Sequence, residues 1–105
     1  MAYQETYTPH KWVILEVIPG ELYKVLGGWG GGYLGSDEWQ INSGIEELKE
    51  ENDYYIAIGF SGSKYILYKE LEGLMMVTGE VVQRIASAGL GVKVVTVEEY
   101  KDIVN

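Results

Sequence analysis

The sequence contains no cysteine, and it has only one histidine, one arginine and two prolines. Without cysteine the chain cannot form disulfides, a catalytic thiolate or a zinc–sulfur site. The single histidine, His10, leaves little for histidine-based metal binding or for a triad, which needs a positioned base and its orienting acid. No apolar run approaches the about 20 residues that a membrane-spanning helix needs.

Basic residues are also scarce, because the chain has 8 of them against 16 acids and a net charge of −8. Proteins that bind a nucleic-acid backbone normally cluster lysine and arginine, so direct nucleic-acid binding is not expected. The acidic balance is consistent with simple solubility, and it also suits a basic surface on a protein partner.

A chain of 105 residues is expected to form a single domain with one core. Residues 1–10 read as a flexible lead-in and residues 11–105 as one domain. The N-terminus lacks the basic and then apolar pattern of a secretory signal, so the expected location is cytoplasmic.

The most informative feature that is present is a glycine-rich segment, residues 27–35, in which six of nine residues are glycine. One interpretation is a sharply bent or bulged strand pair with Trp29 and Tyr33 packed across it. Another is a recognition loop that projects these rings towards a partner. The segment formally matches GxGxxG, but no long helix follows it, and no Gly-Lys-Ser/Thr follows to make a P-loop.

Apolar alternation and turn signals predict an α+β fold, an antiparallel sheet of five to six strands with one main helix, about 79–89, packed on one face. Thr78 is a candidate cap for that helix. Residues 45–51 favour a strand, with a single helical turn as the alternative. The expected strands are 11–18, 21–26, 39–42, 54–60, 64–69 and a C-terminal strand at 92–97, before a short helix at 98–104.

Two patterns that suggest catalysis are better explained by structure. Ser61 and Lys64 match SxxK, but they lie where a hairpin must turn, and the companion motifs are missing. The acidic cluster at 46–53 lacks the pattern of a calcium loop and reads as an exposed charged face. We therefore expect no enzymatic activity, no metal site and no cofactor.

A series of short motifs resembles small proteins carried by phages and prophages. These have the order GGYxxGxxW, NSGI, DYY and SGSxY, which this chain follows over about residues 27–75: Gly31 to Trp39, Asn42 to Ile45, Asp53 to Tyr55 and Ser61 to Tyr65. The resemblance implies an intracellular accessory protein of a mobile element. It carries no known chemistry, so it assigns no residue a role.

The leading hypothesis is a non-enzymatic interaction protein that binds a protein partner through an acidic, aromatic-rich surface, with a basic nucleic-acid-handling enzyme as one candidate partner. The alternatives are a self-associating module, such as a homodimer, and a small-ligand site at the glycine-rich segment. The predicted partner-binding residues are the aromatic anchors and the acids that would steer a partner: Trp29, Tyr33, Trp39, Glu46, Glu47, Glu50 and Glu51.

Overall fold

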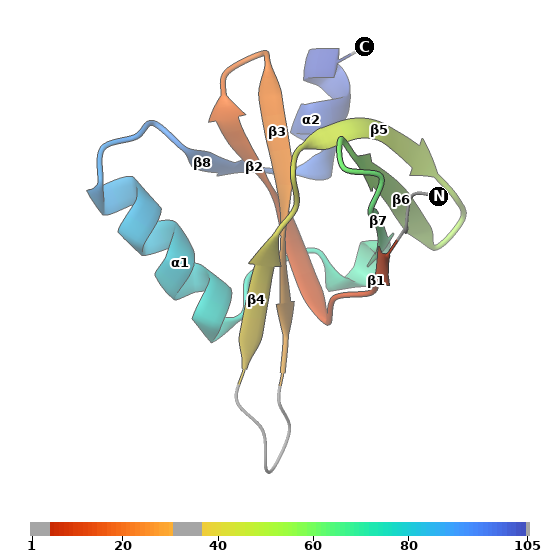
Figure 1. Cartoon of the computed structure of the whole chain (residues 1–105), viewed down its shortest axis with the longest axis horizontal. Coiled ribbons are helices and arrows are strands. Elements are labelled where there is room, and N and C mark those ends of the chain that lie inside the picture. The colour runs from red at the N-terminus through yellow and green to blue at the C-terminus, as the bar shows by residue number, and fades with distance from the viewer. Residues whose placement is uncertain (1–4, 31–36, 105) are drawn as a thin grey trace.

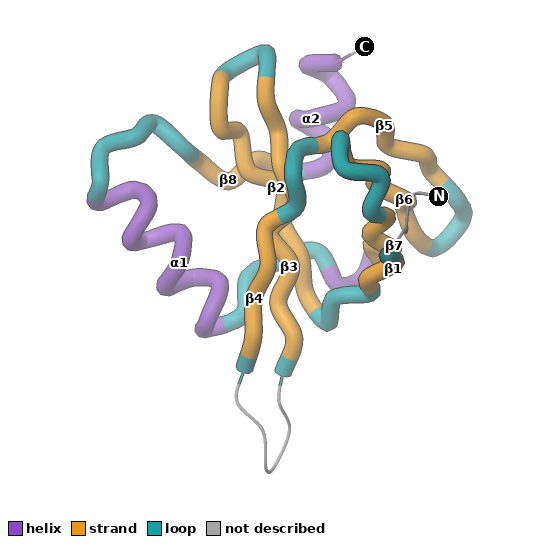
Figure 2. Tube along the Cα trace, in the orientation of Figure 1, coloured by secondary structure: helices purple, strands orange, loops and turns teal. Residues whose placement is uncertain are grey.

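The computed structural model describes residues 5–30 and 37–104. Figures 1 and 2 show the strands and helices that these residues form. The strands and helices are β1 (Thr6–Tyr7), β2 (Lys11–Ile18), β3 (Leu22–Trp29), β4 (Glu38–Ile41), β5 (Ile45–Glu50), β6 (Tyr54–Gly59), β7 (Lys64–Tyr68), α1 (Met76–Ser87), β8 (Lys93–Val95) and α2 (Val97–Val104). A short 3-10 helix at Lys69–Leu71 joins β7 to the segment before α1.

The predicted α+β class is confirmed, but the predicted single sheet is wrong. The strands form two four-stranded sheets, sheet A in the order β1-β7-β6-β5 and sheet B in the order β4-β3-β2-β8. The described residues thus hold eight strands and two helices, rather than five to six strands and one main helix. Pairing is antiparallel except between β1 and β7, which run parallel.

The chain passes from sheet B to sheet A at Asn42, Ser43 and Gly44. The Asn42 side chain is buried, and its Oδ1 accepts hydrogen bonds from the backbone N–H of Val25 at 2.9 Å and of Gly44 at 3.2 Å. Gly44 has φ +137°, a backbone conformation that residues with a Cβ rarely adopt. The sequence marks a break here, but nothing local shows that the next strand joins a different sheet.

Sheet B is the middle layer of the molecule. Figure 1 shows α1 on one side of β2 and β3 and sheet A on the other. Trp12 and Ile14 on one face of β2 belong to the core shared with sheet A, and Val13 and Leu15 on the other face belong to the core under α1. A strand covered on both faces reads as a continuous apolar run, which explains the sequence of β2.

Close packing of α1 on sheet B requires a glycine at position 28. A Cβ built on Gly28 would lie 2.7 Å from Sδ of Met75 and 2.9 Å from Cγ2 of Thr78. Thr78 does not occupy the N-cap position, which is Met75. Its hydroxyl accepts a hydrogen bond from the Met75 N–H at 2.8 Å, as in a capping box.

Most predicted elements are confirmed. The hairpins β2–β3 and β6–β7 form, residues 45–50 are a strand, and the main helix begins a few residues before the predicted position. Residues 1–4 of the predicted lead-in lie outside the described residues, whereas Thr6 and Tyr7 form β1 and pair with β7. No helix in the described residues is both long enough and apolar enough to cross a membrane.

Candidate functional site

A groove of about 520 Å³ opens at the end of the two-sheet core, between β5, the β2–β3 turn and α2. Sheet A contributes its edge strand β5, and sheet B contributes the start of β3. The residues that line the groove are Gly20, Glu21, Tyr23, Ile45, Glu46, Glu47, Leu48, Glu50, Tyr55, Tyr100, Lys101 and Val104.

The floor of the groove is apolar and aromatic. Tyr23, Tyr55 and Tyr100 are almost fully buried members of the core, together with Ile45. The rings of Tyr23 and Tyr100 meet edge to face, with centroids 5.2 Å apart and an interplanar angle of 73°. Burial raises the pKa of both phenols, so the floor stays uncharged.

One hydroxyl of the floor is held in a fixed orientation. The Tyr23 hydroxyl donates to Oε2 of Glu16 at 3.0 Å and accepts a hydrogen bond from the Gly20 N–H at 3.0 Å. Glu16 is itself buried and lies 3.8 Å from Nζ of Lys93. The β2–β3 turn is thereby tied to the floor of the groove.

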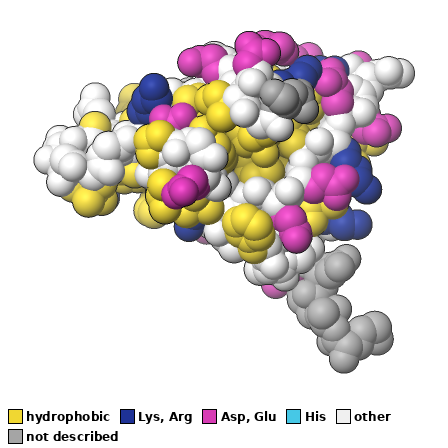
Figure 3. All heavy atoms as spheres, turned by 90° about the horizontal axis from the view of Figure 1, so that it is seen from above, with side chains coloured by type: hydrophobic (Ala, Val, Ile, Leu, Met, Phe, Trp, Pro, Cys, Tyr) yellow, Lys and Arg dark blue, Asp and Glu magenta, His cyan; other side chains and the backbone are white. Residues whose placement is uncertain are grey.

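Acidic side chains surround this floor. Figure 3, seen from above, shows hydrophobic side chains in the middle of this end of the molecule and acidic side chains gathered around them. Glu21 and Glu46 are exposed and line the groove. Among the described residues that line it, Lys101 is the basic one, and it already has acidic partners.

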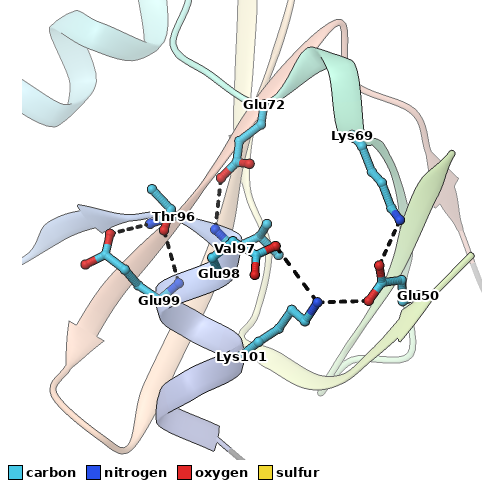
Figure 4. A network of polar contacts seen from close by, with 8 residues as sticks. All are labelled: Glu50, Lys69, Glu72, Thr96, Val97, Glu98, Glu99 and Lys101. Carbon is cyan, nitrogen blue, oxygen red and sulfur yellow. Dashed lines mark hydrogen bonds and ion pairs between the residues drawn. The ribbon is translucent and has the colours of Figure 1, made fainter. Parts of the chain in front are cut away.

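Glu50 joins three elements at one end of the groove (Figure 4). One carboxylate oxygen accepts from Nζ of Lys69 at 2.8 Å and the other from Nζ of Lys101 at 3.0 Å. These contacts hold the pKa of Glu50 below its usual value, and the hydrogen bond from Lys69 is the larger cause. Lys101 also lies 3.9 Å from Glu98. The Glu50 carboxylate thus holds α2 against β5. Because it is already paired with two lysines, it is not free to attract a basic partner.

The helix α2 that forms one wall begins with a capping box (Figure 4). The Thr96 hydroxyl accepts from the Glu99 N–H, and Oε1 of Glu99 accepts from the Thr96 N–H, both at 3.0 Å. These bonds hold the pKa of Glu99 low. Glu72, from the segment before α1, accepts a further bond from the Val97 N–H at 2.9 Å.

The acidic half of the predicted site is only partly brought together. Glu46, Glu47 and Glu50 line the groove, although the strand register places Glu47 beside Ile58 on the outer face of sheet A. Glu51 lies in the β5–β6 turn, where its N–H donates to the carbonyl of Tyr54 at 2.8 Å.

The predicted aromatic anchors do not join the acids. Neither Trp29 nor Trp39 lines the groove, and Tyr33 lies outside the described residues. The register pairs Trp39 with Gly28 and Trp29 with Glu38, so the two indoles lie on opposite faces of sheet B. Trp39 is 45% exposed on the α1 side. Trp29 packs against Tyr7 on the other face, with its Nε1–H donated to the Thr8 carbonyl at 3.1 Å.

A shallower pocket of about 390 Å³ lies beside Trp29. Glu38, Gln40 and His10 line it together with this indole, whereas Trp39 does not. His10 accepts a hydrogen bond from the Gly30 N–H through Nδ1, at 2.8 Å. Among the described residues, this pocket best matches the small-ligand site that the sequence predicts at the glycine-rich segment.

The motifs set aside as non-catalytic occupy structural positions. Ser61 and Ser63 lie in the β6–β7 turn, and the Ser61 N–H donates to Oγ of Ser43 at 3.0 Å. Within residues 5–30 and 37–104, no group of three acidic or histidine side chains is placed to hold a metal ion.

The tyrosines of the groove floor were missed as site residues. The sequence marks Tyr23 and Tyr100 as aromatic, but they are 77 positions apart and meet only because α2 folds back across the end of the sandwich. The Thr96–Glu99 spacing is a capping signal that could have placed the start of α2. No family model, curated protein or solved structure matches this chain. The resemblance to phage-borne proteins therefore stays a prediction.

Proposed function

We propose that the protein is a non-enzymatic binding module whose groove takes a segment of a partner protein that carries basic and apolar side chains. The observation that supports this most strongly is the combination of an aromatic floor with an acidic rim at one site. Apolar side chains of the segment would be buried on Ile45 and Leu48, and its lysines or arginines would lie beside Glu21 and Glu46.

The charges favour a cationic segment over an anionic or neutral one. The whole chain carries −8, and the lysine beside the groove is already paired with Glu50. An acidic rim speeds the encounter with a basic partner more than it adds affinity, because exposed charges are screened by water and salt. A basic surface of a nucleic-acid-handling enzyme from a host cell fits this chemistry, and it remains the proposed class of partner.

The proposal is tested by titrating the protein with fluorescently labelled peptides of equal length. One peptide alternates lysine with leucine, one alternates glutamate with leucine, and one alternates lysine with serine. We expect only the first to bind well, with an on-rate that falls as salt is raised. If the glutamate peptide binds equally well, or if the on-rate of the lysine–leucine peptide does not change with salt, the acidic rim is not the recognition element.

Charge-reversal variants locate the binding surface. Glu46→Lys and Glu21→Lys are expected to weaken binding of the lysine–leucine peptide, whereas Glu80→Lys, an exposed change on α1, is the matched control. Trp29→Ala and Trp39→Ala separate the groove from the anchors predicted from sequence. Loss of binding in the tryptophan variants with none in the glutamate variants would place the site at the indoles and overturn the groove.

A further inference from the structure

The outer face of sheet A is apolar, although the described chain leaves it uncovered. The inward side chains of β6 and β7 are buried in the shared core, as expected. Most side chains on the opposite face are large and apolar, and all of these are half-buried except Tyr68, which is exposed: Tyr54, Ile56, Ile58, Ile66 and Tyr68.

An antiparallel sheet with one face in water normally alternates apolar and polar residues. The strand β6 instead carries apolar side chains on both faces, as β2 does. Both faces of β2 are covered, one by sheet A and the other by α1. Among the described elements, α1 makes its main contacts with β3, β4 and β8, and α2 with β2. The outer face of β6 therefore has the composition of a covered surface.

We infer that a second copy of this chain covers the outer face of sheet A in a symmetric dimer. The argument rests on the charges that flank the apolar stripe. The register places Glu47 of β5 and Lys64 of β7 on either side of Ile58, in one row across the sheet. A row of the form acid, isoleucine, lysine is complementary to its own reversed copy.

A two-fold axis parallel to β6 produces that reversal. It lays β6 of one protomer over β6 of its partner and exchanges the positions of β5 and β7. Ile56 and Ile58 then face their own counterparts, and Glu47 of each protomer lies opposite Lys64 of the partner subunit. Stacked sheets are about 10 Å apart, a gap that long glutamate and lysine side chains span together.

The rest of the surface favours this face over other routes to self-association. Two copies that each carry −8 repel one another unless they meet through a region of low local charge. The strand register places Glu47, Lys49 and Lys64 on the outer face of sheet A, a net charge of +1 on this face against −8 for the whole chain. Pairing through the edge of β5 is hindered by the bulge at Glu46 and by its charged side chains.

Sedimentation velocity over a wide range of concentrations tests the dimer. We expect the wild-type chain to associate as a dimer. Ile56→Lys is expected to weaken dimerisation by at least about 100-fold, because an unpaired charge would be buried at the centre of the interface. Met76→Lys is the control, since Met76 is 81% exposed and lies on α1. A circular dichroism spectrum and melting curve confirm that each variant is folded.

A charge swap identifies the geometry. Glu47→Lys and Lys64→Glu are each expected to weaken dimerisation by about tenfold, and the double variant is expected to recover most of that loss. The inference is overturned if wild-type protein stays monomeric at millimolar concentration, if Ile56→Lys and Met76→Lys behave alike, or if the double swap is additive. Glu47 also lines the groove, so the two proposals are separated by Ile56→Lys, which lies outside the groove, and by Glu21→Lys, whose effect on peptide binding is measured separately.

Discussion

Sheets A and B have the same number of strands and share one core, but their outer faces differ. The outer face of sheet B is closed by α1, which buries Val13, Leu15 and Leu26. The outer face of sheet A carries side chains of the same kind at Ile56, Ile58 and Ile66 and has no such cover among the described residues.

The difference shows that apolar composition and burial within one chain are separate properties. The sequence of β6 is as apolar on both faces as that of β2, so an amino-acid pattern alone would place both strands in the middle of a molecule. Only the three-dimensional arrangement shows that one of them lacks its second layer. Such a face is a candidate for contact with another molecule.

The largest effect is expected from truncating a side chain beneath α1. Leu15→Ala should lower the free energy of unfolding by about 2–5 kcal/mol, because it removes buried methyl groups and leaves a cavity in a packed core. Leu15 is 1% exposed. Chemical denaturation followed by circular dichroism measures the change.

The matched substitution on sheet A is Ile56→Ala in dilute protein. We expect a loss below about 1 kcal/mol, because this side chain keeps contact with water in the single chain. Equal losses in the two variants would show that the outer faces do not differ in burial and would remove the comparison.

The close approach of α1 to sheet B can be broken at Gly28. Gly28→Ala should lower the free energy of unfolding by about 1–3 kcal/mol, since the new methyl group would meet Met75 and Thr78 and push the helix outward. The second of these contacts is the harder to relieve, because Thr78 is buried and β-branched.

Gly79, one residue beyond Thr78, provides the control. A Cβ added at Gly79 would meet nothing within 4 Å. Gly79→Ala should therefore raise the free energy of unfolding by about 0.5–1 kcal/mol, as alanine does inside a helix. A neutral result for Gly28→Ala would show that α1 adjusts its position freely.

The sequence predicts the local elements well, because a strand or helix depends mainly on its own pattern. The run of aromatic and β-branched residues at 54–60 and the apolar stripe at Val81, Val82 and Ile85 are properties of neighbouring residues, and both elements form. Residues 45–51 favour a strand over a helical turn because they are short and offer only Ile45 and Leu48 for burial on a helix, and a strand forms at Ile45–Glu50.

Pairing between distant segments was not predictable in this way. Gly44 signals a break, yet nothing near it says whether the next strand returns to sheet B or starts sheet A. The groove floor depends on Tyr100, whose position is set by α2 crossing the end of the sandwich. Of the predicted acids, Glu46, Glu47 and Glu50 line the groove and Glu51 does not, whereas Glu21 and the aromatic floor were missed.

A smaller effect distinguishes the two sheets inside their shared core. Tyr65 of sheet A is 1% exposed, and its hydroxyl has no hydrogen-bond partner of good geometry among the described residues. Burial raises its pKa to about 12, and the nearby Gln40 side chain offsets this only in part. Tyr65→Phe should raise the free energy of unfolding by up to about 1 kcal/mol, because an unsatisfied polar group is removed.

The counterpart in sheet B is Tyr23, whose hydroxyl bonds to Glu16. Tyr23→Phe should lower the free energy of unfolding, since it leaves that buried carboxylate without its hydrogen-bond donor.

For Tyr65 the folded pKa lies above the value of about 10 in the unfolded chain. The free energy of unfolding is therefore highest below about pH 10, where Tyr65 is protonated in both states, and it falls as the pH rises towards 12. Tyr65→Phe cannot ionise, so this fall should be smaller for the variant in a melting series at alkaline pH.

The smallest effect concerns the ion pairs that join sheet A to α2. The pKa of Glu50 is lowered, chiefly by Lys69 and then by Lys101, so the folded state holds this carboxylate charged more readily than the unfolded chain does. The contribution is therefore present above the unfolded pKa of about 4.3 and is lost as the pH falls through the lower folded value. Melting temperatures of wild type and Glu50→Gln should differ near neutral pH and converge in acid, with Glu80→Gln, an exposed change on α1, as the control. Equal melting temperatures of wild type and Glu50→Gln near neutral pH would show that α2 is held by the packing of Val97 and Tyr100 and not by the ion pairs.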